Sequence, residues 1–145
     1  DEASRVSVPQ QTLQAWHDQG DIEWLGYQED IPAVWRQAAV AVLPSYYREG
    51  IPRSLLEAAS SGRPVVTTDM PGCREIVEDG INGYLVPPRD VVALADALEK
   101  LLRDPLLRER MGRAGRERVL QHFTERQVVA QTLATYQALL ARSDD

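Results

Sequence analysis

Short apolar runs alternate with helix-like segments through the middle of this 145-residue chain. The runs cover residues 40–45 (VAVLPS), 62–69 (GRPVVTTD) and 84–86 (YLV), and turn-forming residues border them. Such short bounded runs are typical of buried strands, and longer segments with apolar residues three or four apart are typical of helices. Strands that alternate with helices predict a parallel sheet with right-handed crossovers. We therefore predict an α/β fold, a Rossmann-like parallel sheet flanked by helices and followed by a helical C-terminal tail.

Capping and turn residues set the limits of the predicted elements. Asp90 and Asp104 suit the N-cap position of a helix. Thr124 and Gln127 have the spacing of a capping box for the last helix. We predict four strands, at residues 21–26, 41–44, 63–68 and 84–86. The helices that we predict cover residues 8–19, 32–39, 52–61 and 73–78, with three more that begin after Asp90, Asp104 and Thr124.

Composition limits the partners and the surroundings of this chain. Its formal charge of −6 argues against nucleic acid or an anionic membrane as the main partner. The single cysteine, Cys73, excludes an internal disulfide and fits a reducing, cytoplasmic compartment. No uninterrupted apolar stretch approaches the roughly eighteen residues of a membrane-spanning helix. The length and the 43% of hydrophobic residues suit one domain, which we place at residues 1–145.

Two carboxylates, Glu49 and Glu57, bracket the start of a predicted helix that follows a strand. In open α/β sheets, ligands bind at the carboxyl ends of the strands. A helix N-terminus at that position offers free N–H groups and a positive dipole end, which suit a diphosphate. The flanking carboxylates can accept hydrogen bonds from the vicinal hydroxyls of ribose or a hexose. This pattern predicts a site for a nucleotide-sugar.

Five blocks in the same stretch resemble, in order and spacing, the C-terminal half of retaining glycosyltransferases with the two-Rossmann (GT-B) architecture, glycosyltransferase family 4. The segment from Tyr47 to Ala58 is most similar to the branch that builds bacterial exopolysaccharide, capsule and lipid-linked oligosaccharide. The blocks are Leu43-Pro44-Ser45, the pair Glu49 and Glu57 seven residues apart, Ala58 to Ser61, Gly62-Arg63-Pro64-Val65-Val66, and Gly72 to Gly83.

The resemblance implies an activity for a longer protein, of which this chain is the donor-binding part. That protein would transfer a hexose from a nucleotide-diphospho-sugar, which we expect to be UDP-linked, to a glycan or lipid-linked acceptor in polysaccharide biosynthesis, with retention. It implies no cofactor and no metal, and His17 and His122 have no partners at catalytic spacing. The acceptor site would lie in a missing N-terminal domain, so we expect the fragment alone to be inactive. We also expect the protein in the cytoplasm, with peripheral association with the membrane at its cytoplasmic face.

The resemblance also assigns roles to individual residues. Glu57 would bind the ribose hydroxyls, and Glu49 would position the donor sugar and stabilise positive charge at its anomeric carbon. Pro52, which lacks an N–H group, departs from the pattern of many relatives. The guanidinium of Arg53 either compensates for that missing donor or belongs to an ordinary surface arginine, and the sequence leaves both open. Further donor-binding residues are Gly50, Ile51, Arg53 and Ser54 at the helix start, Ser45 at the strand end, and Tyr27, which we expect to stack on the base.

Two alternatives and one structural question stay open. A nucleotide-sugar epimerase on the same fold, or a non-catalytic nucleotide-sugar-binding module, would share the helix-terminus site. The family's domain usually has six strands, in the order 3-2-1-4-5-6, and its first two would precede Asp1. We therefore expect either a rearranged or self-associating sheet, or direct pairing between the strands at 21–26 and 41–44.

Overall fold

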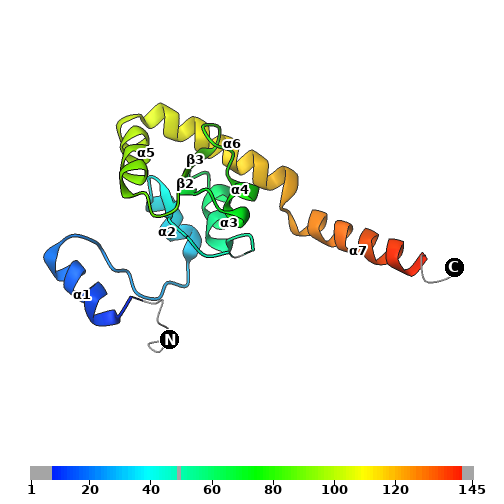
Figure 1. The fold of residues 1–145 in the computed structure, drawn as a ribbon, viewed down its shortest axis with the longest axis horizontal. Coiled ribbons are helices and arrows are strands. Elements are labelled where there is room, and N and C mark those ends of the chain that lie inside the picture. Colours follow the sequence, from blue (N-terminus) through cyan, green and yellow to red (C-terminus); the bar gives the residue numbers. More distant parts are fainter. Residues whose placement is uncertain (1–7, 49, 142–145) are drawn as a thin grey trace. The chain divides into compact units, whose positions relative to one another are not determined.

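The computed structural model describes residues 8–48 and 50–141 of the chain (Figure 1). The chain divides into two compact units, Asp1–Ile31 and Pro32–Asp145. The first unit contains helix α1 (Gln10–Gln19), which ends at Gly20 in the left-handed conformation. The second unit contains the sheet and the residues of the candidate site. The prediction of a single domain over residues 1–145 therefore stays a prediction.

The sheet has three parallel strands in the order β1-β2-β3. They are β1 (Ala41–Leu43), β2 (Val65–Thr68) and β3 (Gly83–Val86). All four residues of the central strand β2 are buried, whereas β1 lies at the edge, where Val42 is 42% exposed. A side chain at Gly83 would have its Cβ only 2.1 Å from the carbonyl oxygen of Val65, so this strand position requires glycine.

Helices cover both faces of the sheet (Figure 1). Successive residues of a strand point to opposite faces, and Val65 and Val66 accordingly enter two different hydrophobic clusters. Val65 packs with residues of α3 (Arg53–Ser60) and α4 (Pro71–Ile76), and Val66 packs with residues of α5 (Val91–Arg103). Helix α6 (Pro105–His122) contributes to both clusters, through Val119 and Met111 respectively. The α/β prediction is confirmed.

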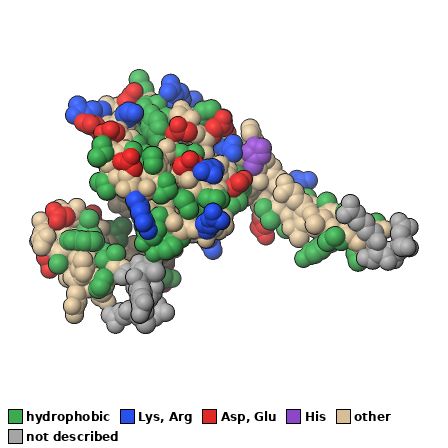
Figure 2. All heavy atoms as spheres, in the orientation of Figure 1, with side chains coloured by type: hydrophobic (Ala, Val, Ile, Leu, Met, Phe, Trp, Pro, Cys, Tyr) green, Lys and Arg blue, Asp and Glu red, His purple; other side chains and the backbone are tan. Residues whose placement is uncertain are grey.

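The helix caps predicted at Asp90, Asp104 and Thr124 are confirmed. The carboxylate of Asp90 accepts a hydrogen bond from the backbone N–H of Ala93, and that of Asp104 accepts one from Leu107, each at 2.9 Å. Helix α7 (Glu125–Ala141) follows Thr124, whose N–H donates to the side-chain oxygen of Gln127 at 3.0 Å. The helix has no buried residue among those described, and Figure 2 shows hydrophobic side chains along it.

One predicted element is absent, and another begins earlier than predicted. Residues 21–26 form no strand, because a strand needs hydrogen-bond partners and a buried face, whereas Ile22 is 40% exposed and Leu25 is 48% exposed. Direct pairing of this segment with β1 is therefore absent from the described sheet. The short helix expected at 73–78 begins at Pro71, because proline suits the first helical turn. The remaining helix of the second unit, α2 (Ile31–Gln37), lies close to its prediction.

Candidate functional site

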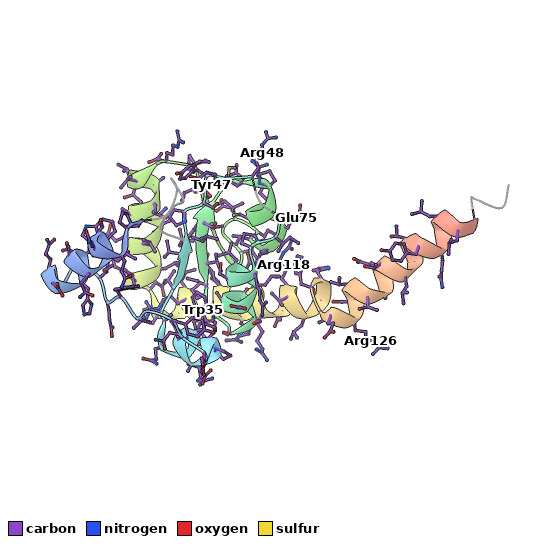
Figure 3. All side chains as sticks on the ribbon, turned by 90° about the horizontal axis from the view of Figure 1, so that it is seen from below. Trp35, Tyr47, Arg48, Glu75, Arg118 and Arg126 are labelled. Carbon is purple, nitrogen blue, oxygen red and sulfur yellow. The ribbon has the colours of Figure 1, made fainter. Side chains whose placement is uncertain are left out.

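The carboxyl ends of the three parallel strands form one edge of the sheet, which we call the carboxyl edge. Residues 44–52 lead from the end of β1 to the start of α3, and residues 69–70 lead from β2 to α4. Figure 3 shows Tyr47 and Arg48 at this end of the sheet and Trp35, in α2, at the opposite end. The predicted site therefore lies where a strand ends and a helix begins, as the sequence indicated.

Two buried threonines at the end of β2 hold the segment that follows β1. The hydroxyl of Thr67 donates to the carbonyl oxygen of Leu43 at 2.7 Å, and the hydroxyl of Thr68 donates to the carbonyl oxygen of Ser45. Both threonines are at most 1% exposed. These bonds fix the backbone at Ser45, a predicted donor-binding residue, and they were not predicted from the sequence. The available signal was a pair of hydroxyl residues at the carboxyl end of an otherwise apolar strand.

The start of α3 presents backbone donors and a charged pair. The first helical hydrogen bonds are donated by Leu55 and Leu56 to the carbonyl of Pro52, so the N–H groups of Arg53 and Ser54 come before them. Pro52 is the N-cap and makes no side-chain capping bond. The N–H groups of a helix start without such a cap are suited to bind an anion. Gly50, Ile51, Arg53 and Ser54 are all exposed, as the predicted role requires.

Glu57 lies one turn inside α3 and pairs with Arg53. The Nε of Arg53 donates to Oε1 of Glu57 at 2.9 Å, and the two side chains are 91% and 34% exposed. The order of charges, arginine before glutamate near a helix N-terminus, is the less favourable one for helix stability. The pair therefore contributes little to the stability of the helix. It does place a cation and a carboxylate side by side at the carboxyl edge.

Arg89 brings a second cation to the segment after β1. Its guanidinium carbon lies 4.8 Å from the ring centroid of Tyr46, and its φ of 65° is in the left-handed region. The hydroxyls of Tyr46 and Tyr47 are 2.7 Å apart, and this hydrogen bond raises the pKa of Tyr47. Arg89 follows β3, far from Tyr46 in the sequence, so local pattern does not connect it with this site. A cation on an aromatic face is an attractive arrangement, and it orders the exposed Tyr46 and Tyr47.

An ion pair lies at the end of β2. The Nη2 of Arg74 donates to the backbone oxygen of Asp69 at 3.1 Å, and Nε donates to its carboxylate. The hydrogen bond from Arg74 lowers the pKa of Asp69. Gly72 is buried in α4 between these residues. Asp69 therefore stays ionised, and its ion pair with Arg74 forms part of the carboxyl edge next to the end of β1.

The remaining predicted residues are placed as follows. Tyr27 belongs to the first unit, is 89% exposed and follows irregular backbone instead of a strand. Glu49 lies outside the described residues. Within residues 8–48 and 50–141, no three His, Cys, Asp or Glu side chains are grouped so that they would hold a metal ion. Over the same residues, no helix is long and apolar enough to span a bilayer.

Comparison with known proteins identifies the family. The sequence profile described as "Glycosyl transferases group 1" matches residues 5–104, and the chain belongs to this family. Solved structures that share its fold are GT-B glycosyltransferases. One of them is HepE of Anabaena in complex with UDP, with a TM-score of 0.76 and 26% identity, covering 86% of this chain and 35% of that one.

Two curated relatives show how the family's activities vary. An exopolysaccharide phosphotransferase of Streptomyces coelicolor is 35% identical over 89% of this chain and 14% of its own length. A phosphatidyl-myo-inositol mannosyltransferase of Mycobacterium leprae is 38% identical over 81% of this chain and 32% of its own length. The chain thus spans less than a third of the length of each.

Proposed function

We propose that this chain is the donor-binding part of a longer glycosyltransferase, which transfers a hexose from a UDP-linked sugar to a glycan or lipid-linked acceptor in polysaccharide biosynthesis, with retention. One observation carries the proposal. At the carboxyl edge, the uncapped start of α3 presents the N–H groups of Arg53 and Ser54, with the carboxylate of Glu57 one turn further on. Such a start suits a diphosphate, and a carboxylate at that distance suits the hydroxyls of the attached ribose.

Arg53 and Glu57 have complementary roles in this proposal. The cation of Arg53 adds charge for the diphosphate and takes the place of the N–H that Pro52 lacks. An ionised carboxylate has about four lone-pair sites, so Glu57 can accept from Arg53 and from two vicinal hydroxyls together. Glu49, on the segment before α3, positions the donor sugar and stabilises charge at the anomeric carbon. Neither role calls for a metal ion or a cofactor.

The choice of UDP is supported by the solved structure of HepE with UDP. We assign the acceptor site to another domain of the longer protein. We place that longer protein in the cytoplasm and at the cytoplasmic face of the membrane. Exposed apolar residues of α7 are suited to contact that domain. They include Val128, Leu133, Tyr136 and Leu140, each at least 50% exposed.

Calorimetric titration of the chain with UDP, GDP and ADP tests the proposal. We expect saturable binding of UDP and about tenfold weaker binding by Glu57→Gln, since one charged hydrogen-bonding group is lost. Glu99→Gln is the matched control, because Glu99 pairs with Arg103 four residues on in another exposed helical ion pair. Equal affinity for the three nucleotides, or an equal loss in the control, would contradict the assignment of this site.

A second candidate reaction is the transfer of a phosphate-linked sugar, which the match to the Streptomyces phosphotransferase favours. Product analysis with the longer protein separates the two reactions. A glycosyl transfer leaves no phosphate on the acceptor, whereas a phosphosugar transfer leaves one that ³¹P NMR detects. An epimerase would convert the nucleotide-sugar without any acceptor, and a non-catalytic module would bind it unchanged.

A further inference from the structure

An open pocket of about 540 Å³ lies at the opposite edge of the sheet, where the strands begin. Its lining comes from the end of α2, the turns that precede β1 and β2, and the first turns of α6. Because the strands are parallel, this amino edge is separated from the carboxyl edge by the length of the sheet. Pockets of about 300–1,000 Å³ accommodate small ligands.

Four arginines line this cavity, which we call the arginine pocket: Arg36, Arg63, Arg108 and Arg113. Glu109 is the single carboxylate among the residues that line it, and Nη2 of Arg113 pairs with it at 2.8 Å. The lining therefore carries a formal charge of about +3 on a chain whose total is −6. A concentration of positive charge in a concave site of an acidic protein indicates an anionic ligand.

Two of the guanidinium groups are held by neutral backbone carbonyls. Nη1 of Arg63 donates to the carbonyl of Ala38 at 3.1 Å. Nη1 of Arg108 donates to the carbonyls of Leu101 and Leu102, at the end of α5, at 2.7 and 2.8 Å. These bonds order the side chains but leave their charge uncompensated. A guanidinium ordered in this way loses less entropy when it binds an anion.

The Nε of Arg63 is buried and has no hydrogen-bond partner among the described residues. A buried donor without a partner costs free energy, and such groups are rare in native proteins. Arg63 lies in the turn between α3 and β2, directly at the pocket. The guanidinium must turn towards the cavity before an oxyanion can bind side-on through Nε and a terminal nitrogen, and that change would also give the buried donor a partner.

The wall of the pocket is built by a close backbone contact. Gly62 has a φ of 72°, and the Cβ of a residue larger than glycine at position 112 would lie 2.0 Å from its carbonyl oxygen. Helix α6 therefore packs directly on the turn that carries Arg63. This contact fixes the turn that carries Arg63 against the helix that carries Arg108 and Arg113, so the pocket is formed before any ligand binds.

We propose that the arginine pocket binds a phosphate monoester as a second site, separate from the nucleotide-sugar site. Arginine binds phosphate with paired, charge-assisted hydrogen bonds, and the volume accommodates the phosphate with an attached sugar-sized group. The phosphate belongs either to a soluble sugar phosphate or to a lipid headgroup. The site does not depend on which nucleotide binds at the carboxyl edge.

Calorimetry with inorganic phosphate and glucose 6-phosphate tests the soluble source, in about 0.15 M salt so that weak surface charge effects are screened. Cosedimentation with vesicles of phosphatidylcholine, with and without phosphatidic acid, tests the lipid source. Saturable binding in either arm supports the proposal and names the source. Binding in neither arm overturns it.

Variants assign the binding to the pocket. We expect Arg63→Gln and Arg113→Gln to weaken phosphate binding by about tenfold each and to leave UDP affinity unchanged. Arg103→Gln is the matched control, because it removes an exposed, paired arginine outside the pocket. Arg113 is 66% exposed, so its substitution tests the site even if Arg63→Gln impairs folding. An equal loss in the Arg103→Gln control would show nonspecific charge attraction and would contradict the proposal.

Discussion

The two edges of the sheet carry charge in different ways. At the carboxyl edge, Arg53 pairs with Glu57 and Arg74 pairs with Asp69, so two cations have a carboxylate beside them, while Arg89 lies on the ring of Tyr46. At the amino edge, Arg63 and Arg108 bond to backbone carbonyls. The first arrangement offers acceptors together with donors, as a ligand with a diphosphate and hydroxyls requires. The second offers four arginines against one carboxylate, Glu109, an excess of donors that suits a simple anion.

The two edges also differ in how the backbone is held. Side-chain hydroxyls of Thr67 and Thr68 tie the carboxyl edge together, whereas the contact between Gly62 and Gly112 holds the amino edge. A side-chain hydrogen bond can be removed without displacing the backbone, whereas a side chain added between two touching backbone segments must displace one of them. We therefore expect a side chain added at the contact between Gly62 and Gly112 to lower stability most, and loss of the Thr68 hydroxyl to weaken nucleotide binding as well as stability.

The largest effect is expected for Gly112→Ala. The added Cβ would lie 2.0 Å from the carbonyl oxygen of Gly62, so α6 must move and about 2–3 kcal/mol of unfolding free energy is lost. Gly115→Ala, in the same helix, is the control. Its Cβ would meet Ala59 at 3.6 Å, an ordinary contact, so we expect about 0.5–1 kcal/mol of stabilisation from helix propensity. Urea denaturation measures both, and similar results would refute the rigid contact.

An intermediate effect is expected for Thr68→Val at the carboxyl edge. The change keeps the shape of the side chain but removes the hydroxyl that donates to Ser45, at a cost of about 1–2 kcal/mol. Nucleotide binding should weaken at the same time, because the segment before α3 is no longer fixed. Thr68→Ser keeps the hydroxyl and should retain affinity. Weakened binding in both variants, measured by calorimetry, would point to packing instead of the hydrogen bond.

The smallest effect is expected for the pair of Asp69 and Arg74. Because Arg74 lowers the pKa of Asp69 in the folded state, the pair stabilises the fold above the ordinary aspartate pKa, and this contribution is lost as pH falls through the lowered value. The relevant range is below about pH 4. NMR titration of Asp69 should show its pKa rise in Arg74→Gln. An unchanged pKa would show that the pair does not persist in solution.

Much of the fold was predictable because it depends on neighbours in the chain. The capping bonds of Asp90 and Asp104 join residues three apart, and the short buried run that became β2 lies between clear turn residues. The start of α3 was predictable for the same reason, because Pro52 marks it. The strand expected at 21–26 failed because a strand depends on a partner elsewhere in the chain, which local pattern does not reveal.

The sequence by itself determined the order of helices and strands, the parallel sheet and the placement of Glu57 at a helix start, because these follow from local spacing and capping. The tertiary structure decided which residues meet at each edge of the sheet. The bonds from Thr68 to Ser45 and from Arg63 to Ala38 span 23 and 25 residues. Arg89 reaches Tyr46 only because β1 and β3 end at the same edge. Contacts of this range arise from packing, which brings distant segments together and which local sequence pattern does not encode.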